Sequence, residues 1–215
     1  MSTLADLRQE YARAELTRDH VTDDPIEQFR DWFDEALDAE LEEPNAMTLA
    51  TAAPDGSPSA RIVLLKGLDE RGFHFYTNYD SRKGTELSQN PHAALTFLWK
   101  PLERQVRIKG SVERMPADES TEYFHSRPRG AQLGAWASPQ SRVVAGRSEL
   151  EQNLDEVTAE YADHDEIPRP SHWGGYVVRP TQIEFWQGRP NCLHDRLRYR
   201  RLDEGSDWTL ERLAP

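Results

Sequence analysis

The spacing of hydrophobic and polar positions divides the chain into a helical start and a β-rich body. Apolar residues recur at helical spacing at Leu4, Leu7, Tyr11 and Ala14. A second helix is predicted after Asp24-Pro25, because a capping Asp followed by Pro at the first helical position is a common start signal. Pro44 ends this helix, whose apolar stripe has an acidic back. Residues 1–45 therefore predict a helical N-terminal arm.

From residue 46 the pattern changes to strands separated by turn signals. Strands are predicted over residues 46–53, 59–66, 73–78, 93–99, 103–115, 176–179, 183–186, 197–202 and 208–213. Helices are predicted over residues 81–90, 116–124, 132–137 and 147–162. Several strands in near succession, joined by short turns, favour an antiparallel sheet, and closing that sheet into a small barrel removes its edges. We expect one domain over residues 1–215, mostly β with flanking helices.

Charge narrows the possible ligands. The formal net charge is −12, and most of it falls in residues 1–45, so the remaining body is nearly neutral. No long basic stretch occurs, which argues against nucleic-acid binding. The arginines of the body fall in short clusters, and such clusters suit one small anion, such as a phosphate, better than a polymer.

Composition also bears on location and metal binding. No apolar run approaches the ~20 residues that span a bilayer, so no membrane partner is expected. Residues 1–10 are polar and acidic, unlike a signal or transit peptide. The single cysteine, Cys192, excludes an internal disulfide and a multi-thiolate metal site, and the histidines are scattered. We expect a cytoplasmic protein without a metal.

Two groups of cations are candidates for binding a phosphate. Arg61 and Lys66 bracket an apolar stretch of a predicted strand, although ordinary strand-end charges explain that pair equally well. Ser81-Arg82-Lys83 opens a predicted helix just after a strand. The N–H groups of a helix start, a hydroxyl and two cations together make a plausible phosphate cradle.

A nucleophilic site is less well supported. Cys192, His194 and Asp195 lie close together in the sequence, which suggests a Cys-His-Asp nucleophile. Working triads are usually assembled from distant parts of a sequence, so a small structural thiol is the favoured interpretation.

Longer motifs occur in order along the chain. They are Arg61 to Lys66, Phe75-Tyr76-Thr77-Asn78, Ser81-Arg82-Lys83, Leu102-Glu103-Arg104-Gln105-Val106, Tyr123 to Arg129, Gly134-Ala135-Trp136, Gln140-Ser141, Trp173-Gly174-Gly175, Ile183 to Gly188, and Leu193-His194-Asp195-Arg196. Together these motifs closely resemble the pyridoxamine 5′-phosphate oxidase family, over roughly residues 5 to 215.

The resemblance implies an FMN-binding split β-barrel that works as a homodimer, with two flavin sites at the subunit interface. The implied FMN contacts are Arg61, Ile62, Val63, Leu64, Leu65, Lys66, Tyr76, Thr77, Arg82, Lys83, Gln105, Gln140, Ser141, Trp186 and Arg196. The implied substrate contacts are Arg8, Tyr11, Lys66, Tyr123, Arg127, Ala131, Cys192 and His194. Among these, His194 would lie near the pyridine ring as the catalytic residue, and Arg8 and Tyr11 would belong to an arm that folds over the site.

Two positions depart from the family pattern. Ala131 stands where the family usually has Ser, and Cys192 stands where it usually has Arg. A lost neutral hydrogen bond costs only ~0.5–1.5 kcal/mol, so the first change is minor. The second removes a cation expected near the reacting carbon, which bears on substrate turnover more than on FMN binding. Arg189 and Arg198 are neighbours that could replace that charge.

The implied reaction oxidises pyridoxamine or pyridoxine 5′-phosphate to pyridoxal 5′-phosphate, with O2 as acceptor. Hydrogen peroxide is released, and the amine substrate also yields ammonia. Two alternatives remain on the same fold: a weakly active or non-catalytic protein that binds FMN or pyridoxal phosphate, and a flavin reductase. The retained Lys66, Tyr123, Arg127 and His194 argue against both, because neither alternative needs them.

Overall fold

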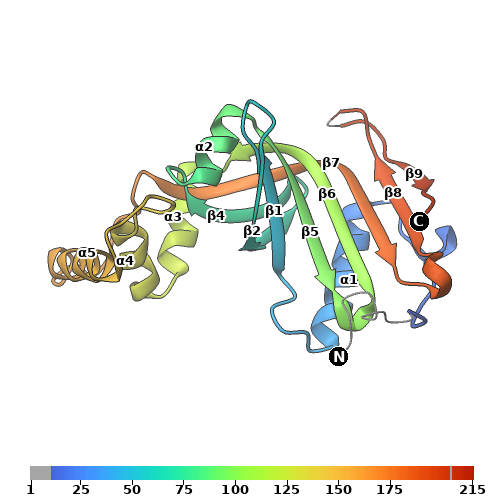
Figure 1. Ribbon diagram of the computed structural model, residues 1–215, viewed down its shortest axis with the longest axis horizontal. Helices are drawn as coiled ribbons and strands as arrows, with labels where there is room; N and C mark the ends of the chain where they lie inside the picture. Colours follow the sequence, from blue (N-terminus) through green and yellow to red (C-terminus); the bar gives the residue numbers. More distant parts are fainter. Residues whose placement is uncertain (1–10, 204) are drawn as a thin grey trace.

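An antiparallel sheet forms the centre of the computed structural model, which describes residues 11–203 and 205–215 (Figure 1). Its strands follow the order β2 (Pro58–Leu64), β1 (Ala46–Ala52), β5 (His92–Trp99), β6 (Arg104–Arg114), β7 (Trp173–Gln187), β4 (Gly72–Asn78) and β3 (Gly67–Asp69). Two further strands, β8 (Asp195–Arg200) and β9 (Thr209–Arg212), extend the sheet from β7. The predicted antiparallel, mostly β fold is confirmed.

The long strand β7 joins two parts of the curved sheet. Its first half pairs with β4 and its second half with β8, while β6 runs along both halves. The register shifts between Lys109 and Gly110, opposite Pro180, which has no N–H to donate. A Cβ at Gly110 would lie 1.9 Å from the carbonyl oxygen of Arg179, so only glycine fits there. The sequence predicted two strands at this place, and that prediction was wrong because the proline forms a bulge without ending the strand.

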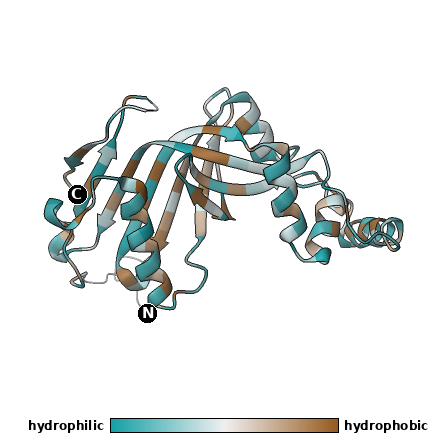
Figure 2. Ribbon diagram, turned by 180° about the vertical axis from the view of Figure 1, so that it is seen from behind, coloured by the Kyte–Doolittle hydropathy of each residue, from teal (hydrophilic) through white to brown (hydrophobic). Residues whose placement is uncertain are grey.

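The helix α1 (Pro25–Asp38) covers one face of the sheet, as the view from behind shows (Figure 2). Asp24 caps it, with Oδ1 accepting the N–H of Ile26 at 2.8 Å. The ring of Phe29 lies 4.9 Å from Phe73 and 5.0 Å from Phe97. These buried aromatic contacts make α1 part of the main hydrophobic core.

Of the other four α-helices described, the first packs on the main core through Leu87, and the next three cover a second, smaller core. It consists of Phe124, Leu133, Tyr161, Ile167 and Trp173. The helices are α2 (Arg82–Gln89), α3 (Ala117–Ser126), α4 (Arg129–Ala137) and α5 (Arg147–Glu160), and short 3-10 turns occur at η2 (Arg18–His20), η3 (Lys100–Leu102) and η4 (Pro190–Cys192). In Figure 1, α4 and α5 project from one end of the sheet. Among the described helices, none has both the length and the apolar character needed to cross a membrane.

The N-terminal prediction needs a correction. The predicted first helix is absent from residues 11–17, and its earlier part, with Arg8, lies outside the described residues. The backbone N–H groups of Ala12 and Arg13 bond instead to the carboxylate of Glu103, and that of Leu16 bonds to Asp195. Carboxylates from the body of the protein therefore take the place of helical carbonyls. The sequence also missed β3, which lies between the strands predicted over residues 59–66 and 73–78.

Candidate active site

A cavity of about 340 Å³ lies among β2, β4, α2 and α3. Its lining residues are Arg61, Ile62, Val63, Leu64, Lys66, Tyr76, Thr77, Lys83, Tyr123, Arg127, Gln140 and Trp173. All but Trp173 are predicted FMN or substrate contacts. The fold therefore brings together residues that lie far apart in the sequence.

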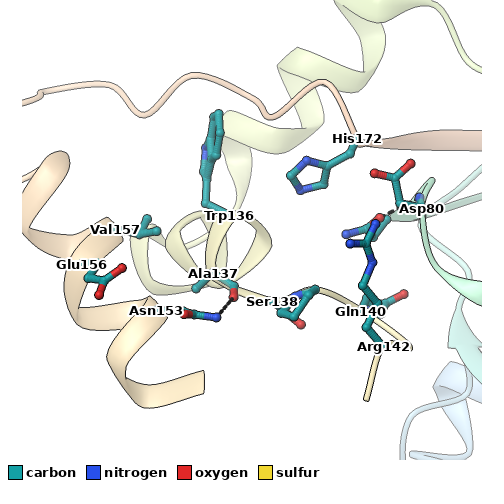
Figure 3. A pocket seen from close by; sticks show the side chains of 12 residues that line it. Asp80, Trp136, Ala137, Ser138, Gln140, Arg142, Asn153, Glu156, Val157 and His172 are labelled. Carbon is teal, nitrogen blue, oxygen red and sulfur yellow. Dashed lines mark hydrogen bonds between the residues drawn. The ribbon is translucent and has the colours of Figure 1, made fainter. Parts of the chain in front are cut away.

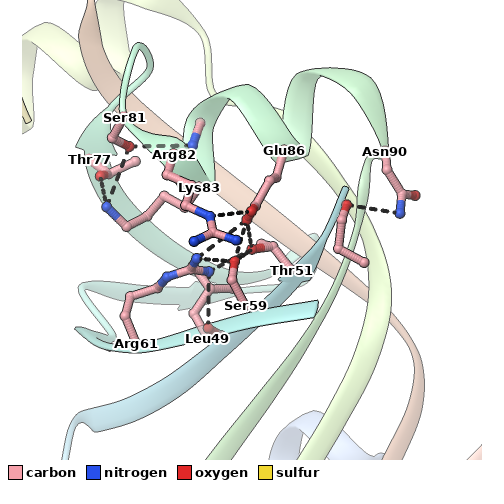
Figure 4. A network of polar contacts seen from close by, with 12 residues as sticks. Leu49, Thr51, Ser59, Arg61, Thr77, Ser81, Arg82, Lys83, Glu86 and Asn90 are labelled. Carbon is pink, nitrogen blue, oxygen red and sulfur yellow. Dashed lines mark hydrogen bonds and ion pairs between the residues drawn. The ribbon is translucent and has the colours of Figure 1, made fainter. Parts of the chain in front are cut away.

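Beside this cavity, cations from β2 and α2 surround one buried carboxylate (Figure 4). We call Arg61, Arg82, Lys83 and Glu86 the phosphate clasp. Glu86 accepts hydrogen bonds from Ser59 Oγ at 2.6 Å, Arg82 Nε at 2.9 Å and Arg61 NH2 at 3.3 Å. Burial alone raises the pKa of Glu86, but these bonds and one from Thr51 outweigh it and lower the pKa to about 2. The carboxylate is thus ionised and holds both guanidinium groups in place.

Lys83 completes the clasp but has no carboxylate of its own. Ser81 caps its helix, accepting the N–H of Gly84 at 3.3 Å. Lys83 Nζ donates to Gln140 Oε1 at 2.7 Å and to Thr77 Oγ1 at 3.2 Å, both neutral. Burial, together with the charge of Arg61, lowers the pKa of Lys83 to about 8. Like charges face one another here, as expected of a site that receives an anion.

Arg127 lies deeper in the same cavity. Its NH1 atom is buried without a hydrogen-bond partner among the described residues. The guanidinium lies 4.6 Å from the ring centre of Trp173, and burial lowers its pKa. Nearby, the rings of Tyr76 and Tyr123 stack at 3.8 Å. A buried cationic nitrogen left unpaired is costly, so this one points to a second anion position.

The other predicted site residues gather at the far ends of β6 and β7. Gln105, Trp186 and Arg196 face one another across β6, β7 and β8 in register. The ring of His194 lies 4.6 Å from Trp186, and Nδ1 accepts the backbone N–H of Arg189 at 3.1 Å. We call Gln105, Trp186, His194 and Arg196 the aromatic corner.

Beside the aromatic corner is a second cavity, of about 260 Å³, lined by Tyr11, Leu98, Lys100, Glu103, Gln105 and Trp186. No described residue lines both this cavity and the first. The predicted site residues therefore form two groups within one chain, at different parts of the sheet (Figure 1).

Several predicted residues lie outside both cavities. Leu65 has its side chain in the main core, so only its backbone is available to a ligand. Ser141 follows Gln140 in the left-handed conformation, at φ 70°, and is exposed. Ala131 lies on α4, and Cys192 is exposed. The placement of these residues alone does not test their predicted contacts.

A third cavity, of about 360 Å³, lies between α4, α5 and the loop that joins β4 to α2 (Figure 3). Its charged groups are mixed, with Asp80 and Glu156 opposed by Arg142. Gln140 lines both this cavity and the first one. The sequence did not predict it.

Comparisons with known proteins agree with this geometry. A sequence model described as pyridoxamine 5′-phosphate oxidase matches residues 33–161, and one described as the pyridoxine 5′-phosphate oxidase C-terminal dimerisation region matches residues 173–215. The chain is 85% identical to a pyridoxine/pyridoxamine 5′-phosphate oxidase of Salinibacter ruber, over all of both chains. The chain belongs to the pyridoxamine 5′-phosphate oxidase family.

Solved structures support the fold. PhzG from Burkholderia lata, in complex with tetrahydrophenazine-1-carboxylic acid, is 31% identical, with a TM-score of 0.87, over 95% of this chain and 100% of that one. A pyridoxamine 5′-phosphate oxidase-related, FMN-binding protein from Nostoc punctiforme is 19% identical, with a TM-score of 0.67, over 87% of this chain and 97% of that one. The sheet is thus the split barrel of this oxidase family.

The residues present fit FMN, the cofactor of the family. Three cations against one carboxylate leave the phosphate clasp with a net charge of +2, and a phosphate monoester carries nearly −2 at neutral pH. Lys83, buried beside the like charge of Arg61 and bonded to neutral partners, is placed to receive the negative charge of that phosphate.

Sequence reasoning missed two residues of this oxidase site. Glu86 lies four positions after Arg82 on one helix, and that spacing could have revealed their ion pair. Glu103 gave no comparable signal, because its partners lie about 90 residues away in the arm.

Proposed function

We propose that this chain oxidises pyridoxamine 5′-phosphate and pyridoxine 5′-phosphate to pyridoxal 5′-phosphate with bound FMN. The family assignment supports this activity. The observation that carries it is the buried, unpartnered nitrogen of Arg127 in the cavity that Lys66 and Tyr123 also line. The phosphate clasp suffices for FMN alone, so a second cationic position suits a phosphorylated substrate.

When bound, FMN supplies the hydride acceptor for the C4′ carbon of the substrate, and O2 then takes the electrons to give hydrogen peroxide. The protein contributes position and charge. Arg61, Arg82 and Lys83 would hold the flavin phosphate, and Lys66, Tyr123 and Arg127 that of the substrate. Two fixed phosphates orient the substrate ring against the flavin, which is the main task left to the protein.

His194 would donate a hydrogen bond to the substrate. Its Nδ1 atom accepts the backbone N–H of Arg189, so the neutral ring carries its hydrogen on Nε2. That N–H is then a donor for a polar group on the pyridine ring. Trp186, against which His194 packs, offers an apolar surface that keeps water out.

We further propose a homodimer in which each flavin is bound by the phosphate clasp of one subunit and the aromatic corner of the other. Two observations support it: the predicted contacts line separate cavities, and residues 173–215 match a dimerisation region. Large apolar side chains near both groups are also exposed, with Ile62 64% and Leu98 65% accessible. Cytoplasmic location, O2 as acceptor and the absence of nucleic-acid partners stay predictions of the sequence.

The activity is tested by measuring hydrogen peroxide released by FMN-loaded protein given pyridoxamine 5′-phosphate. Peroxide and pyridoxal 5′-phosphate should form in equal amounts. Flavin reduced only by a nicotinamide donor would support the reductase alternative. Tight FMN binding without peroxide would support the non-catalytic one.

The shared site is tested by mixing two inactive variants, Arg61→Ala and Trp186→Ala. Random exchange of subunits in a two-fold dimer leaves one intact site in half of the molecules, so roughly a quarter of the wild-type activity should return. No recovery after confirmed subunit exchange would contradict the shared site.

A further inference from the structure

Glu103 ties three segments together at the corner between η3 and β6. Its Oε2 atom accepts the backbone N–H groups of Ala12 and Arg13, both at 3.0 Å. Its own carbonyl oxygen accepts the N–H of Gly188 at 2.7 Å. Its backbone is left-handed, with φ 55°, which is uncommon for a residue with a side chain. Such a conformation persists only where the surroundings hold it, and here both the carbonyl and the carboxylate are engaged.

The same contacts place Tyr11 on the aromatic corner. Its ring meets Trp186 and His194 edge-on, each at 5.8 Å between ring centres. Gly188 leaves the space that Tyr11 fills, because a Cβ there would lie 2.7 Å from Tyr11 Cβ. The next residue, Ala12, is the first that Glu103 holds, so the position of Tyr11 depends on that bond.

More distant ties hold the rest of the arm. Glu15 pairs with Arg189 at 2.7 Å, and the N–H of Leu16 donates to Asp195 at 3.1 Å. These contacts lie four or more residues after Tyr11. They anchor the base of the arm. Between them and Tyr11, Arg189 NH1 donates to the carbonyl oxygen of Ala14 at 3.1 Å and Arg13 NH1 donates to that of Pro101 at 2.8 Å. Glu103 is therefore not the only tie at this end, but its bond to Ala12 is the one nearest to Tyr11 among the described residues.

We propose that Glu103 is a positioning residue that latches residues 11–13 over the aromatic corner, so that Tyr11 closes the reacting end of the substrate site. The inference rests on the proposed function for its catalytic consequence but not for its structural one. A latched arm excludes water and holds the substrate, and a released arm leaves the corner open.

The test uses FMN-loaded, full-length protein and three variants. Glu103→Gly removes the carboxylate and suits the left-handed backbone, so it separates the latch from backbone strain. Glu103→Gln keeps one neutral acceptor. Glu113→Gln is the matched control, because Glu113 lies near the other end of β6, the strand that Glu103 precedes, and pairs with Arg179, away from the arm.

The first readout is the rate of limited trypsin cleavage after Arg13, well below the melting temperature. Loss of two charge-assisted bonds should speed cleavage about tenfold or more in Glu103→Gly, with a smaller increase in Glu103→Gln and none in Glu113→Gln. The second readout is kinetic: KM for pyridoxamine 5′-phosphate should rise several-fold in Glu103→Gly, with FMN content unchanged.

Unchanged cleavage in a folded Glu103→Gly protein would overturn the latch. So would a general increase at other arginines, because that outcome indicates global loosening. If Glu103→Gly fails to fold, Glu103→Gln must still cleave faster than Glu113→Gln. Wild-type protein that produces no peroxide would refute the proposed function, while the cleavage experiment would still decide the latch.

Discussion

The phosphate clasp and the aromatic corner are held together by different kinds of contact. In the clasp, the buried Glu86 holds Arg61 and Arg82, and Lys83 bonds to neutral partners. In the corner, the aromatic contacts of Trp186 and His194 are reinforced by an arm that the body of the protein holds from outside. The side chains of the clasp are therefore suited to binding an anion, and those of the corner are suited to packing against a ring and to being covered by the arm.

This difference indicates which of the two groups of residues is already in place before a ligand binds. The side-chain bonds that Glu86 accepts in the clasp join β1 and β2 to α2, so this part of the clasp exists before any ligand arrives. The corner is completed by residues 11–16, whose contacts to the body are a few hydrogen bonds, one ion pair and the ring contacts of Tyr11. Substitutions in the clasp should therefore affect stability and cofactor binding, and those in the corner should affect turnover.

The largest effect is expected from Glu86→Ala. It leaves Arg61, whose side chain is 20% exposed, without its carboxylate, and breaking such a mostly buried pair costs about 3–5 kcal/mol. Urea denaturation of the flavin-free protein measures this. Glu113→Ala breaks a pair in which the carboxylate is 56% exposed, and about 1 kcal/mol or less is expected. Equal losses in the two variants would mean that the clasp is not specially preformed.

The next largest effect is expected from a substitution of Arg127, which lines the first cavity. Arg127→Ala removes a cation expected to bind the substrate phosphate, a charged contact worth ~1.5–3 kcal/mol. The kcat/KM for pyridoxamine 5′-phosphate should fall roughly ten- to a hundredfold. FMN content should stay near that of wild type, whereas Arg61→Ala and Lys83→Ala should yield largely colourless protein. Loss of flavin from Arg127→Ala would show that the two anion positions are not separate.

Within the corner, Cys192→Arg should raise kcat/KM by about tenfold, near the lower limit for one charged contact. The neighbours that could replace the charge are already engaged: Arg189 pairs with Glu15 at 2.7 Å, and Arg198 with Glu211. Cys192 has φ 60°, and arginine suffers no more than cysteine in that conformation. Steady-state kinetics of the two proteins decide the matter, and equal kcat/KM would show that this chain needs no cation there.

The smallest expected effect is a change in the protonation of Lys83 when FMN binds. In the flavin-free protein the pKa of Lys83 is lowered to about 8, below its ordinary 10.5, so its charged form is disfavoured by folding. Stability of that protein should therefore rise with pH between about 8 and 10.5. A bound phosphate favours the charged form and raises this pKa, so FMN binding near pH 8.5 should take up part of a proton and weaken as pH rises further.

Calorimetry of FMN binding in two buffers with different ionisation enthalpies measures that uptake. The phosphate itself does not titrate here, since its second pKa is about 6. Lys83→Met should bind FMN more weakly, and titrated at FMN concentrations high enough to saturate it, this variant should show no uptake. The same uptake in Lys83→Met as in wild type would assign the proton to another group.

How far the sequence predicted this molecule depended on the range of each interaction. Local signals placed most elements within a few residues, as with the Asp24-Pro25 start of α1. They failed at Pro180, where pairing on both sides carries the strand through a bulge, and at residues 11–17, where carboxylates of the body replace helical bonds. The ordered motifs contain the residues of the first cavity but only Glu103, Gln105 and Trp186 of the second. Their separation into two groups could not be predicted, because it depends on how β7 connects two parts of the sheet.

That strand has a consequence for the tolerance of the chain to insertions. Trp173, at the start of β7, lines the first cavity, and Trp186, near its end, lines the second. The 13 steps between them span roughly 40 Å if straight, at about 3.3 Å per residue. One inserted residue would turn every later side chain of β7 to the opposite face of the sheet and remove Trp186 from its cavity. The length of β7 therefore fixes the spacing between the two cavities. Insertions should be accommodated in the loops around this strand and not within it.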